Sequence, residues 1–159
     1  MNARVPASAG VLLGAPHAAL WPGLAGLMPL LACAVLPLFL DAGWHPLLQR
    51  ALVAYGAVIL AFVGAIHWGI GLMAAREPAA GARFAWSVLP AMWGWFALFP
   101  SFLVSLGMLG TGFIVQLTVD WRVAGTFGLP AWYLALRSWL TSGVLLAFLL
   151  ASFVTAVAA

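Results

Sequence analysis

Residues 51–73 read ALVAYGAVILAFVGAIHWGIGLM, a run of 23 positions without Asp, Glu, Lys or Arg. An α-helix rises about 1.5 Å per residue, so this run extends roughly 35 Å as a helix. The hydrocarbon core of a bilayer is about 30 Å thick, and backbone polar groups inside it must bond to one another. The stretch therefore predicts a transmembrane helix.

The composition of the whole chain agrees with a membrane environment. Hydrophobic residues make up 66% of the 159 positions and charged residues only 6%, whereas a soluble domain carries about 25% charged residues. So few charges cannot cover a surface that faces water. The net charge of +3 comes from Arg residues scattered along the chain, which form no basic patch for nucleic acid. We expect the lipid bilayer, and no nucleic acid, as the main partner.

Further apolar segments of similar length accompany the first. They show no strand-like alternation, and open strands would leave backbone groups unpaired in lipid. We predict an all-α membrane protein, a bundle of about five transmembrane helices at about 21–40, 51–73, 84–99, 102–119 and 130–158. In this prediction residues 1–20 are a flexible cytoplasmic tail and residues 21–159 a single transmembrane helical domain.

The third predicted helix is the shortest. The apolar run 84–119 is too long for one pass, and Pro100 with Ser101 offers a turn near its middle, which predicts a helical hairpin. Residues 84–99 would extend only about 24 Å and contain Pro90, so this segment can alternatively be re-entrant.

The arginines predict the orientation of the bundle. If the tail lies on one side, that side carries five arginines and the opposite side only Arg50; the five are Arg4, Arg76, Arg83, Arg122 and Arg137. Cytoplasmic loops are enriched in Lys and Arg, so the N-terminus is predicted inside and the C-terminus outside. The membrane is then the bacterial inner membrane, or the mitochondrial inner membrane in a eukaryote.

Small residues recur every fourth position on the second predicted helix, at Ala57, Ala61, Ala65 and Gly69, with Gly64 beside them. Small residues let neighbouring helices approach closely. Packing within the bundle explains this stripe, and the alternative is a face between two copies of the chain.

One polar residue from each of the last four helices falls in the predicted cytoplasmic third: His67, Ser87, Gln116 and Thr141. Polar and ionisable side chains are costly inside a membrane and often functional. With Trp93 and Trp95, which lie in mid-helix, these residues are a candidate ligand-binding layer. His67 can ligate haem, bond a quinone or relay a proton; alternatively it is a neutral structural imidazole bonded to Gln116 or Ser87.

Asp120, Arg122 and Arg137 border the same inner face. They can form an ion-pair cluster or bind an anionic headgroup, or simply mark helix ends by snorkelling. The chain contains no HExxH or CxxC motif and no nucleophile with an adjacent base, so we predict no catalytic residue and no metal site. The sequence does not identify a cofactor.

Four segments carry a resemblance to a known family: LMPLL at 27–31, AYGAVILAFVGAIHWGIGL at 54–72, WSVLP at 86–90 and DWRVAGTFGLPAWYLALRSWLT at 120–141. Over residues 16–149 the chain resembles the membrane family called domain of unknown function 3429, the transmembrane protein 69-like proteins. Where that family has an IPF-like start, this chain has LMPLL. The resemblance implies a multi-pass protein without an established reaction, and family positions at Gly64, His67, Trp68, Asp120, Trp132, Tyr133, Arg137 and Thr141.

Two main functional hypotheses follow, and a third with less support is a membrane enzyme in which His67 is the general base and Asp120 or Arg137 positions a headgroup. The first is a non-enzymatic accessory, assembly or scaffold factor of a membrane complex, with other inner-membrane proteins or a second copy as partners. The alternative is a binding or transport module for a hydrophobic cofactor, quinone or lipid that uses the polar layer around His67. In size and in its nine tryptophans the chain also resembles the translocator-type tryptophan-rich sensory proteins, which bind porphyrins and sterols, although their Pro-rich first-loop motifs are missing.

Overall fold

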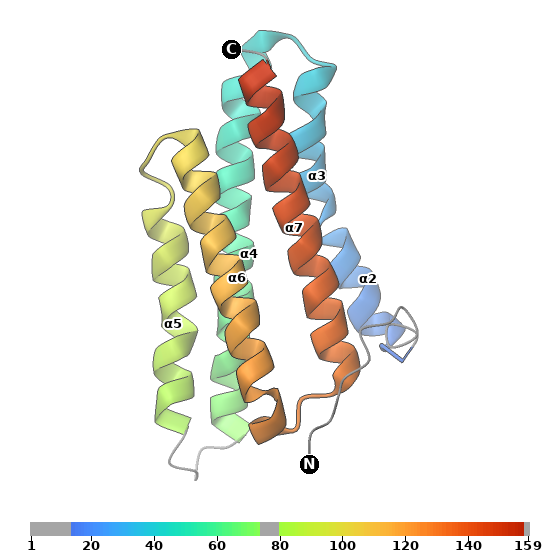
Figure 1. Cartoon of the computed structure of the whole chain (residues 1–159), viewed down its shortest axis with the longest axis vertical. Coiled ribbons are helices and arrows are strands. Elements are labelled where there is room, and N and C mark those ends of the chain that lie inside the picture. The colour runs from blue at the N-terminus through green and yellow to red at the C-terminus, as the bar shows by residue number, and fades with distance from the viewer. Residues whose placement is uncertain (1–13, 74–79, 158–159) are drawn as a thin grey trace.

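The computed structural model describes residues 14–73 and 80–157, and all regular structure within these ranges is helical. Figure 1 shows the long helices running side by side along one axis. The predicted all-α bundle is therefore confirmed. The α-helices are α2 (His17–Ala25), α3 (Met28–Val35), α4 (His45–Met73), α5 (Ala80–Phe96), α6 (Phe102–Phe127) and α7 (Ala131–Val157); the short 3-10 helices η1 (Leu36–Leu38) and η2 (Ala42–Trp44) join α3 to α4.

Four helical stretches are long and apolar enough to cross a membrane: His17–Leu38, Ala42–Met73, Phe102–Phe127 and Ala131–Val157. The fifth helix of the bundle, α5, has 17 residues and extends about 26 Å. It is a single helix, and the turn that joins it to α6 stops short of the end that α4 and α7 reach (Figure 1).

The first predicted helix, 21–40, is broken into several pieces. Helix α2 begins at His17, inside the stretch predicted as a tail, whose residues 1–13 lie outside the described part of the chain. Pro29 and Pro37 stand in the first turns of α3 and η1. A proline has no N–H to donate to the preceding turn, so the helical ladder restarts at each of these positions.

Residues 120–129, which the prediction leaves between two helices, are largely helical. Helix α6 continues to Phe127, about two turns beyond the predicted end at residue 119. It stops at Gly128, whose φ of 62° lies in the left-handed region and whose N–H donates to the Ala124 carbonyl. Glycine accepts this conformation without strain. As a result, Asp120 lies inside a helix instead of at its end.

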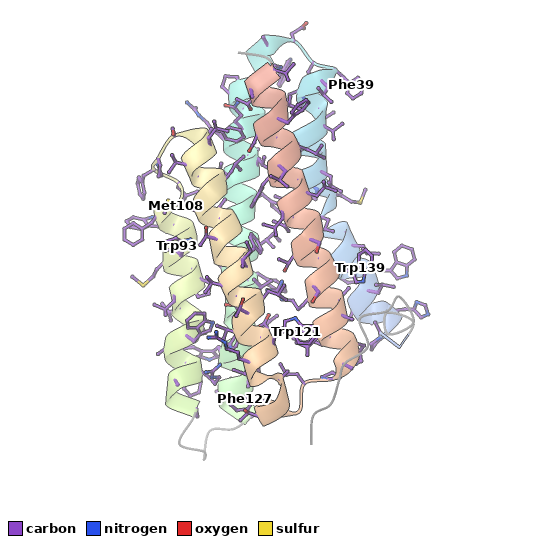
Figure 2. All side chains as sticks on the ribbon, viewed as in Figure 1. Phe39, Trp93, Met108, Trp121, Phe127 and Trp139 are labelled. Atoms are coloured by element: carbon purple, nitrogen blue, oxygen red, sulfur yellow. The ribbon has the colours of Figure 1, made fainter. Side chains whose placement is uncertain are left out.

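The apolar core lies between α3, α4, α6 and α7. Its largest fully buried side chains include Leu30, Leu52, Leu60, Leu109 and Phe113. Many large hydrophobic side chains also project from the outside of the bundle, among them the labelled Phe39 and Trp139 (Figure 2). An apolar exterior of this kind is the surface that lipid covers.

Helices α4 and α5 approach each other closely through small residues. A Cβ built on Gly64 would lie 2.6 Å from Pro90 Cγ, and one built on Gly94 would lie 3.1 Å from the carbonyl oxygen of Ala57. The predicted small-residue stripe is thus divided. Ala57 and Gly64 are buried, whereas Ala65 and Gly69 are exposed, and the homodimer face stays a prediction.

The described arginines separate between the two ends of the bundle. The start of α5, the end of α6 and the start of α7 share one end and carry Arg83, Arg122 and Arg137, while Arg50 belongs to the first turns of α4 at the other end (Figure 1). Arg4 and Arg76 lie outside the described residues. We call the end with three arginines the arginine-rich end; that it faces the cytoplasm stays a prediction.

Candidate functional site

A single buried carboxylate joins three helices near the arginine-rich end. Asp120 on α6 is only 1% exposed. Its Oδ1 lies 2.8 Å from His67 Nε2 on α4 and accepts a hydrogen bond from Gln116 Nε2 at 3.0 Å, while its Oδ2 accepts one from Arg137 Nε on α7 at 3.0 Å. A charge inside a membrane requires such partners.

The neighbours of His67 decide where its ring proton lies. Nδ1 is 3.3 Å from Arg83 Nη1 on α5. A guanidinium group can only donate hydrogen bonds, so Nδ1 must be the acceptor. The proton is then on Nε2, which donates to Asp120. In this arrangement His67 is neutral, and the carboxylate of Asp120 pairs with the guanidinium of Arg137.

Two further side chains extend the cluster. Trp86 Nε1 on α5 donates to Gln116 Oε1 at 2.9 Å, and Arg137 Nη1 donates to Thr141 Oγ1 at 3.5 Å. The resulting polar network links α4, α5, α6 and α7; its members are His67, Arg83, Trp86, Gln116, Asp120, Arg137 and Thr141.

The polar network contains more donors and more positive charge than it can pair internally. Arg83 and Arg137 are cations, whereas Asp120 is its single acid. Three buried polar atoms have no hydrogen-bond partner in the described structure: Arg83 Nε, Arg137 Nη2 and the nearby hydroxyl of Tyr133 on α7. Buried donors normally find an acceptor, so this region is chemically suited to receive an electron-rich or negatively charged group.

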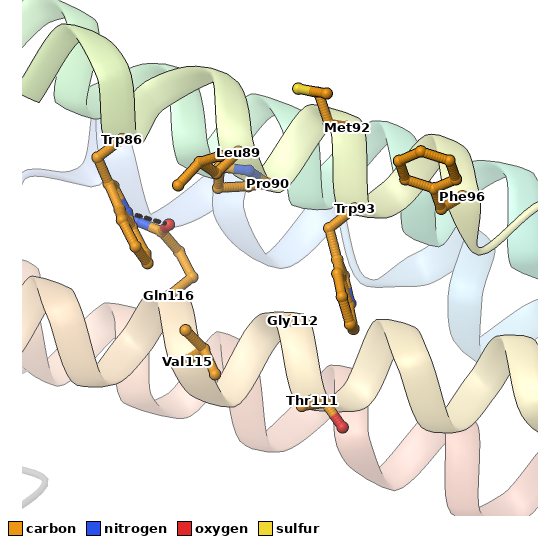
Figure 3. Close-up of a pocket in the computed structure, with 10 residues that line it drawn as sticks. All are labelled: Trp86, Leu89, Pro90, Met92, Trp93, Phe96, Thr111, Gly112, Val115 and Gln116. Atoms are coloured by element: carbon orange, nitrogen blue, oxygen red, sulfur yellow. Dashed lines mark hydrogen bonds between the residues drawn. The ribbon is translucent and has the colours of Figure 1, made fainter.

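An apolar groove of about 390 Å³ lies between α5 and α6. Its walls are mainly the side chains of Trp86, Leu89, Met92, Trp93, Phe96 and Val115 (Figure 3). Several of these residues are about half exposed on the outside of the bundle, so the groove opens sideways, toward lipid. One end is formed by the bonded pair Trp86 and Gln116 (Figure 3), and there the groove meets the polar network.

Two features shape the middle of the groove. Trp93 Nε1 donates to the carbonyl of Met108 at 2.7 Å, which fixes the indole between the two helices (Figure 3). Gly112 lies opposite, and a Cβ built on it would be 2.9 Å from Trp93 Cδ1 and 2.7 Å from Leu60 Cδ2. The indole therefore occupies space that any larger residue at position 112 would need.

The candidate ligand layer predicted from the sequence is assembled only in part. His67, Gln116 and Thr141 belong to the polar network, but His67 bonds to Asp120 instead of Gln116 or Ser87. Ser87 is buried and donates to the Phe84 carbonyl of its own helix.

The tryptophans and the charged residues of that prediction do not all lie at one site. Trp93 lines the groove, whereas Trp95 projects outward beside Phe96 and Phe99. Asp120 and Arg137 form an ion pair, and Arg122 is exposed. Within the described residues no three His, Cys, Asp or Glu side chains gather as metal ligands.

Sequence reasoning missed Arg83 and Trp86 as members of the polar network. The predicted helices 51–73 and 84–99 leave Arg83 in the connection between them, whereas α5 begins at Ala80. Residues three and four apart share one face of a helix. This spacing in the sequence could have placed Arg83 and Trp86 on the same helix face as Pro90 and Trp93.

Comparison with known proteins gives one family and named relatives. Residues 15–153 match the family model described as "Protein of unknown function (DUF3429)". The chain is 34% identical over 139 residues to "Transmembrane protein 69" of Xenopus tropicalis, a match over 82% of this chain and 51% of that protein. It is 36% identical over 89 residues to the Mus musculus protein of the same name, over 55% of this chain and 36% of that protein.

The chain thus spans about half the length of the frog relative and about a third of the mouse relative. No solved structure matches it. The family model covers most of the sequence, the helices are apolar and long enough to cross a bilayer, and the relatives are named as transmembrane proteins. This chain is a multi-pass membrane protein that belongs to the DUF3429 family.

Proposed function

We propose that the protein is a non-enzymatic module that binds an amphiphilic molecule taken laterally from the bilayer. The observation that carries the proposal is the direct junction between the apolar α5–α6 groove and the polar network, at the hydrogen bond between Trp86 and Gln116. The apolar part of the ligand lies in the groove, and its polar part lies at the junction.

The size and lining of the groove support this role. Its volume of about 390 Å³ falls within the range of small-molecule sites, which are mostly apolar with a few placed polar groups. From Trp86 to Phe96 the groove follows α5 for about 15 Å, enough for a substantial part of a lipid chain or a flat hydrophobic cofactor.

The hydrogen bonds of the polar network favour binding over catalysis. The carboxylate of Asp120 already accepts from three donors, and both ring nitrogens of His67 have partners. A general base needs a free acceptor within reach of the substrate proton. The two residues with acid–base chemistry are instead occupied in holding helices together.

Blocking the groove tests the proposal. Val115 lines the groove and is 45% exposed, whereas its neighbour Ile114 is 52% exposed and lies outside the lining. We expect the wild type and Ile114→Trp to co-purify with the same amphiphile in mild detergent, and Val115→Trp to lose it. Mass spectrometry of organic extracts measures the difference. Identical extracts from the two tryptophan variants would contradict the proposal.

A second candidate is the accessory or assembly role in an inner-membrane complex. It is favoured by the outer side of α4, where Ala65 and Gly69 are exposed and a Cβ on Gly69 would meet nothing within 4 Å. Small exposed residues allow a helix of another protein to approach. Affinity purification should then recover a near-stoichiometric partner that Gly69→Leu removes. A wild-type protein that purifies alone would count against this role.

We also propose that the arginine-rich end faces the cytoplasm of a bacterium or the matrix of a mitochondrion, in accordance with the positive-inside rule. A reporter fused to the C-terminus should then score as external. An internal score would reverse the orientation of the polar network and of the groove.

A further inference from the structure

We infer that the molecule held in the groove carries an anionic head, a phosphate or a carboxylate, and that Arg83 binds this head. The inference rests on the proposed function, because it names the chemical class of the ligand of the same groove. It also assigns a role to the one cation of the polar network that has no acidic partner among the described residues.

The position of Arg83 on α5 supports the assignment. Arg83, Trp86, Pro90 and Trp93 follow one another at intervals of three or four residues, so they lie on one face of the helix. Trp86, Pro90 and Trp93 line the groove. Arg83 therefore stands about one helical turn, roughly 5 Å, beyond the polar end of the groove. A head attached to a chain in the groove arrives at this turn.

The contacts of Arg83 leave part of its guanidinium group available. Nη1 lies 3.3 Å from the neutral His67, and Cζ lies 5.8 Å from the centre of the Phe127 ring on α6. Its Nε is buried and has no hydrogen-bond partner among residues 14–73 and 80–157. Guanidinium groups bind carboxylates and phosphates through two parallel N–H donors, so an anionic oxygen pair can use donors that the described side chains leave unpaired.

The charge balance points to an anion instead of a neutral head. Among the described residues, Asp120 is the acid of the polar network and its second oxygen is bonded to Arg137, which leaves Arg83 as the excess positive charge of that part of the chain. An uncompensated charge at the membrane is costly. A phosphate or carboxylate at Arg83 neutralises it, whereas a zwitterionic or neutral head does so less effectively or not at all.

The test uses the full chain reconstituted in nanodiscs of phosphatidylcholine. Brominated stearate and brominated phosphatidate supply the two anionic heads on a chain, and brominated phosphatidylcholine supplies the zwitterionic one. Bromine quenches nearby tryptophans, and other tryptophans are exposed on the outside of the bundle. The difference in quenching between each protein and the same protein with Trp93→Phe therefore reports occupancy of the groove. Inorganic phosphate, which has no chain, is added as a competitor.

We expect the wild type to bind stearate and phosphatidate more tightly than phosphatidylcholine. Arg83→Gln should weaken the two anionic probes about tenfold, the loss of a charge-assisted hydrogen bond, and leave phosphatidylcholine unchanged. Arg83→Lys keeps the charge and loses the planar fork, so it should fall between the two. Arg122→Gln is the matched control, because Arg122 is an exposed arginine at the same end of the bundle.

Other results would overturn either the anionic head or the proposed function. Equal binding of all three lipids, or equal effects of Arg83→Gln and Arg122→Gln, would overturn the anionic head while leaving groove binding intact. Competition by inorganic phosphate at the same concentration as the lipid would overturn the requirement for a chain. Identical organic extracts from Val115→Trp and Ile114→Trp would defeat the proposed function itself. If Arg83→Gln does not fold, the binding of the anionic probes to Arg83→Lys is compared with their binding to Arg122→Gln. Equal binding to these two variants would overturn the anionic head.

Discussion

The two halves of the bundle are held together by different interactions. Toward the end with Arg50, helices meet through fully buried apolar side chains such as Leu30, Leu52 and Leu109. At the arginine-rich end they meet through the polar network around Asp120. In water the first type of contact would dominate. In a bilayer it gains little from the solvent, because lipid tails are as apolar as leucine.

The comparison shows where the bundle obtains its specificity. Apolar helices in lipid can slide and rotate against one another at small cost unless close packing or hydrogen bonds fix them. In the apolar half the fixing comes from close approach, as between Gly94 and the Ala57 carbonyl. In the polar half it comes from the carboxylate of Asp120, whose three hydrogen-bond partners lie on α4, α6 and α7. Substitutions in the two halves should therefore change the stability of the bundle by different amounts and for different physical reasons.

The largest effect is expected from Asp120→Ala. The change leaves Arg137 buried without its acid and removes the acceptor for His67 and Gln116. Removing one partner of a buried ion pair costs about 3–5 kcal/mol. Unfolding of the purified protein in mixed micelles of increasing SDS content measures this loss.

A double variant separates lost charge pairing from lost packing. Asp120→Leu combined with Arg137→Leu replaces both charges with apolar groups, a change that is often neutral when the two partners are removed together. We expect it to be clearly more stable than Asp120→Ala alone. Equal destabilisation would mean that the carboxylate does more than neutralise Arg137.

An intermediate effect is expected from Gly64→Ala, in the close contact of α4 with α5. The new methyl group would lie 2.6 Å from Pro90 Cγ, so one helix must move, at a cost of about 1–3 kcal/mol. Gly69→Ala on the same helix is the control, because a Cβ there has open space. The same SDS unfolding experiment compares the two, and equal stability would refute the close contact.

The smallest effect is expected from Trp86→Phe, which removes the indole donor to Gln116 but keeps an aromatic ring in the groove wall. Hydrogen bonds between transmembrane helices contribute about 0.6 kcal/mol on average. Trp139→Phe, at an exposed indole, controls for the general loss of a tryptophan. A loss of stability larger than that caused by Gly64→Ala would mean that the hydrogen bond between Trp86 and Gln116 is the main contact between α5 and α6.

The sequence predicted the fold class because composition alone determines the solvent. Runs such as 51–73 can only be helices in lipid, and the structure confirms the bundle. The breaks in the first predicted helix were less visible. Pro29 and Pro37 explain them afterwards, but prolines also occur inside intact helices of this chain, at Pro22 and Pro90. Local sequence does not decide which proline ends a helix.

The structure brings part of the predicted layer together, with other hydrogen-bond partners than expected, and its role in ligand binding stays a prediction. Counting from helix ends placed His67, Gln116 and Thr141 together, and all three belong to the polar network. Asp120 was placed at the membrane border because polarity suggested that α6 ended at residue 119. The helix continues until Gly128 stops it, so polarity was a poor guide to a helix end whose charges are paired inside the bundle.

Pro90 has a mechanical consequence for α5. Having no N–H, it cannot donate to the carbonyl of Trp86, and a helix bends most easily where that bond is missing. The segment before Pro90 is held by Arg83 and Trp86. The segment after it is held by the hydrogen bond of Trp93 to the Met108 carbonyl and by the close contact of Gly94 with Ala57. The two sides of the position that lacks a backbone hydrogen bond are therefore both tied to neighbouring helices, which keeps the groove wall in place where the helix itself is weakest.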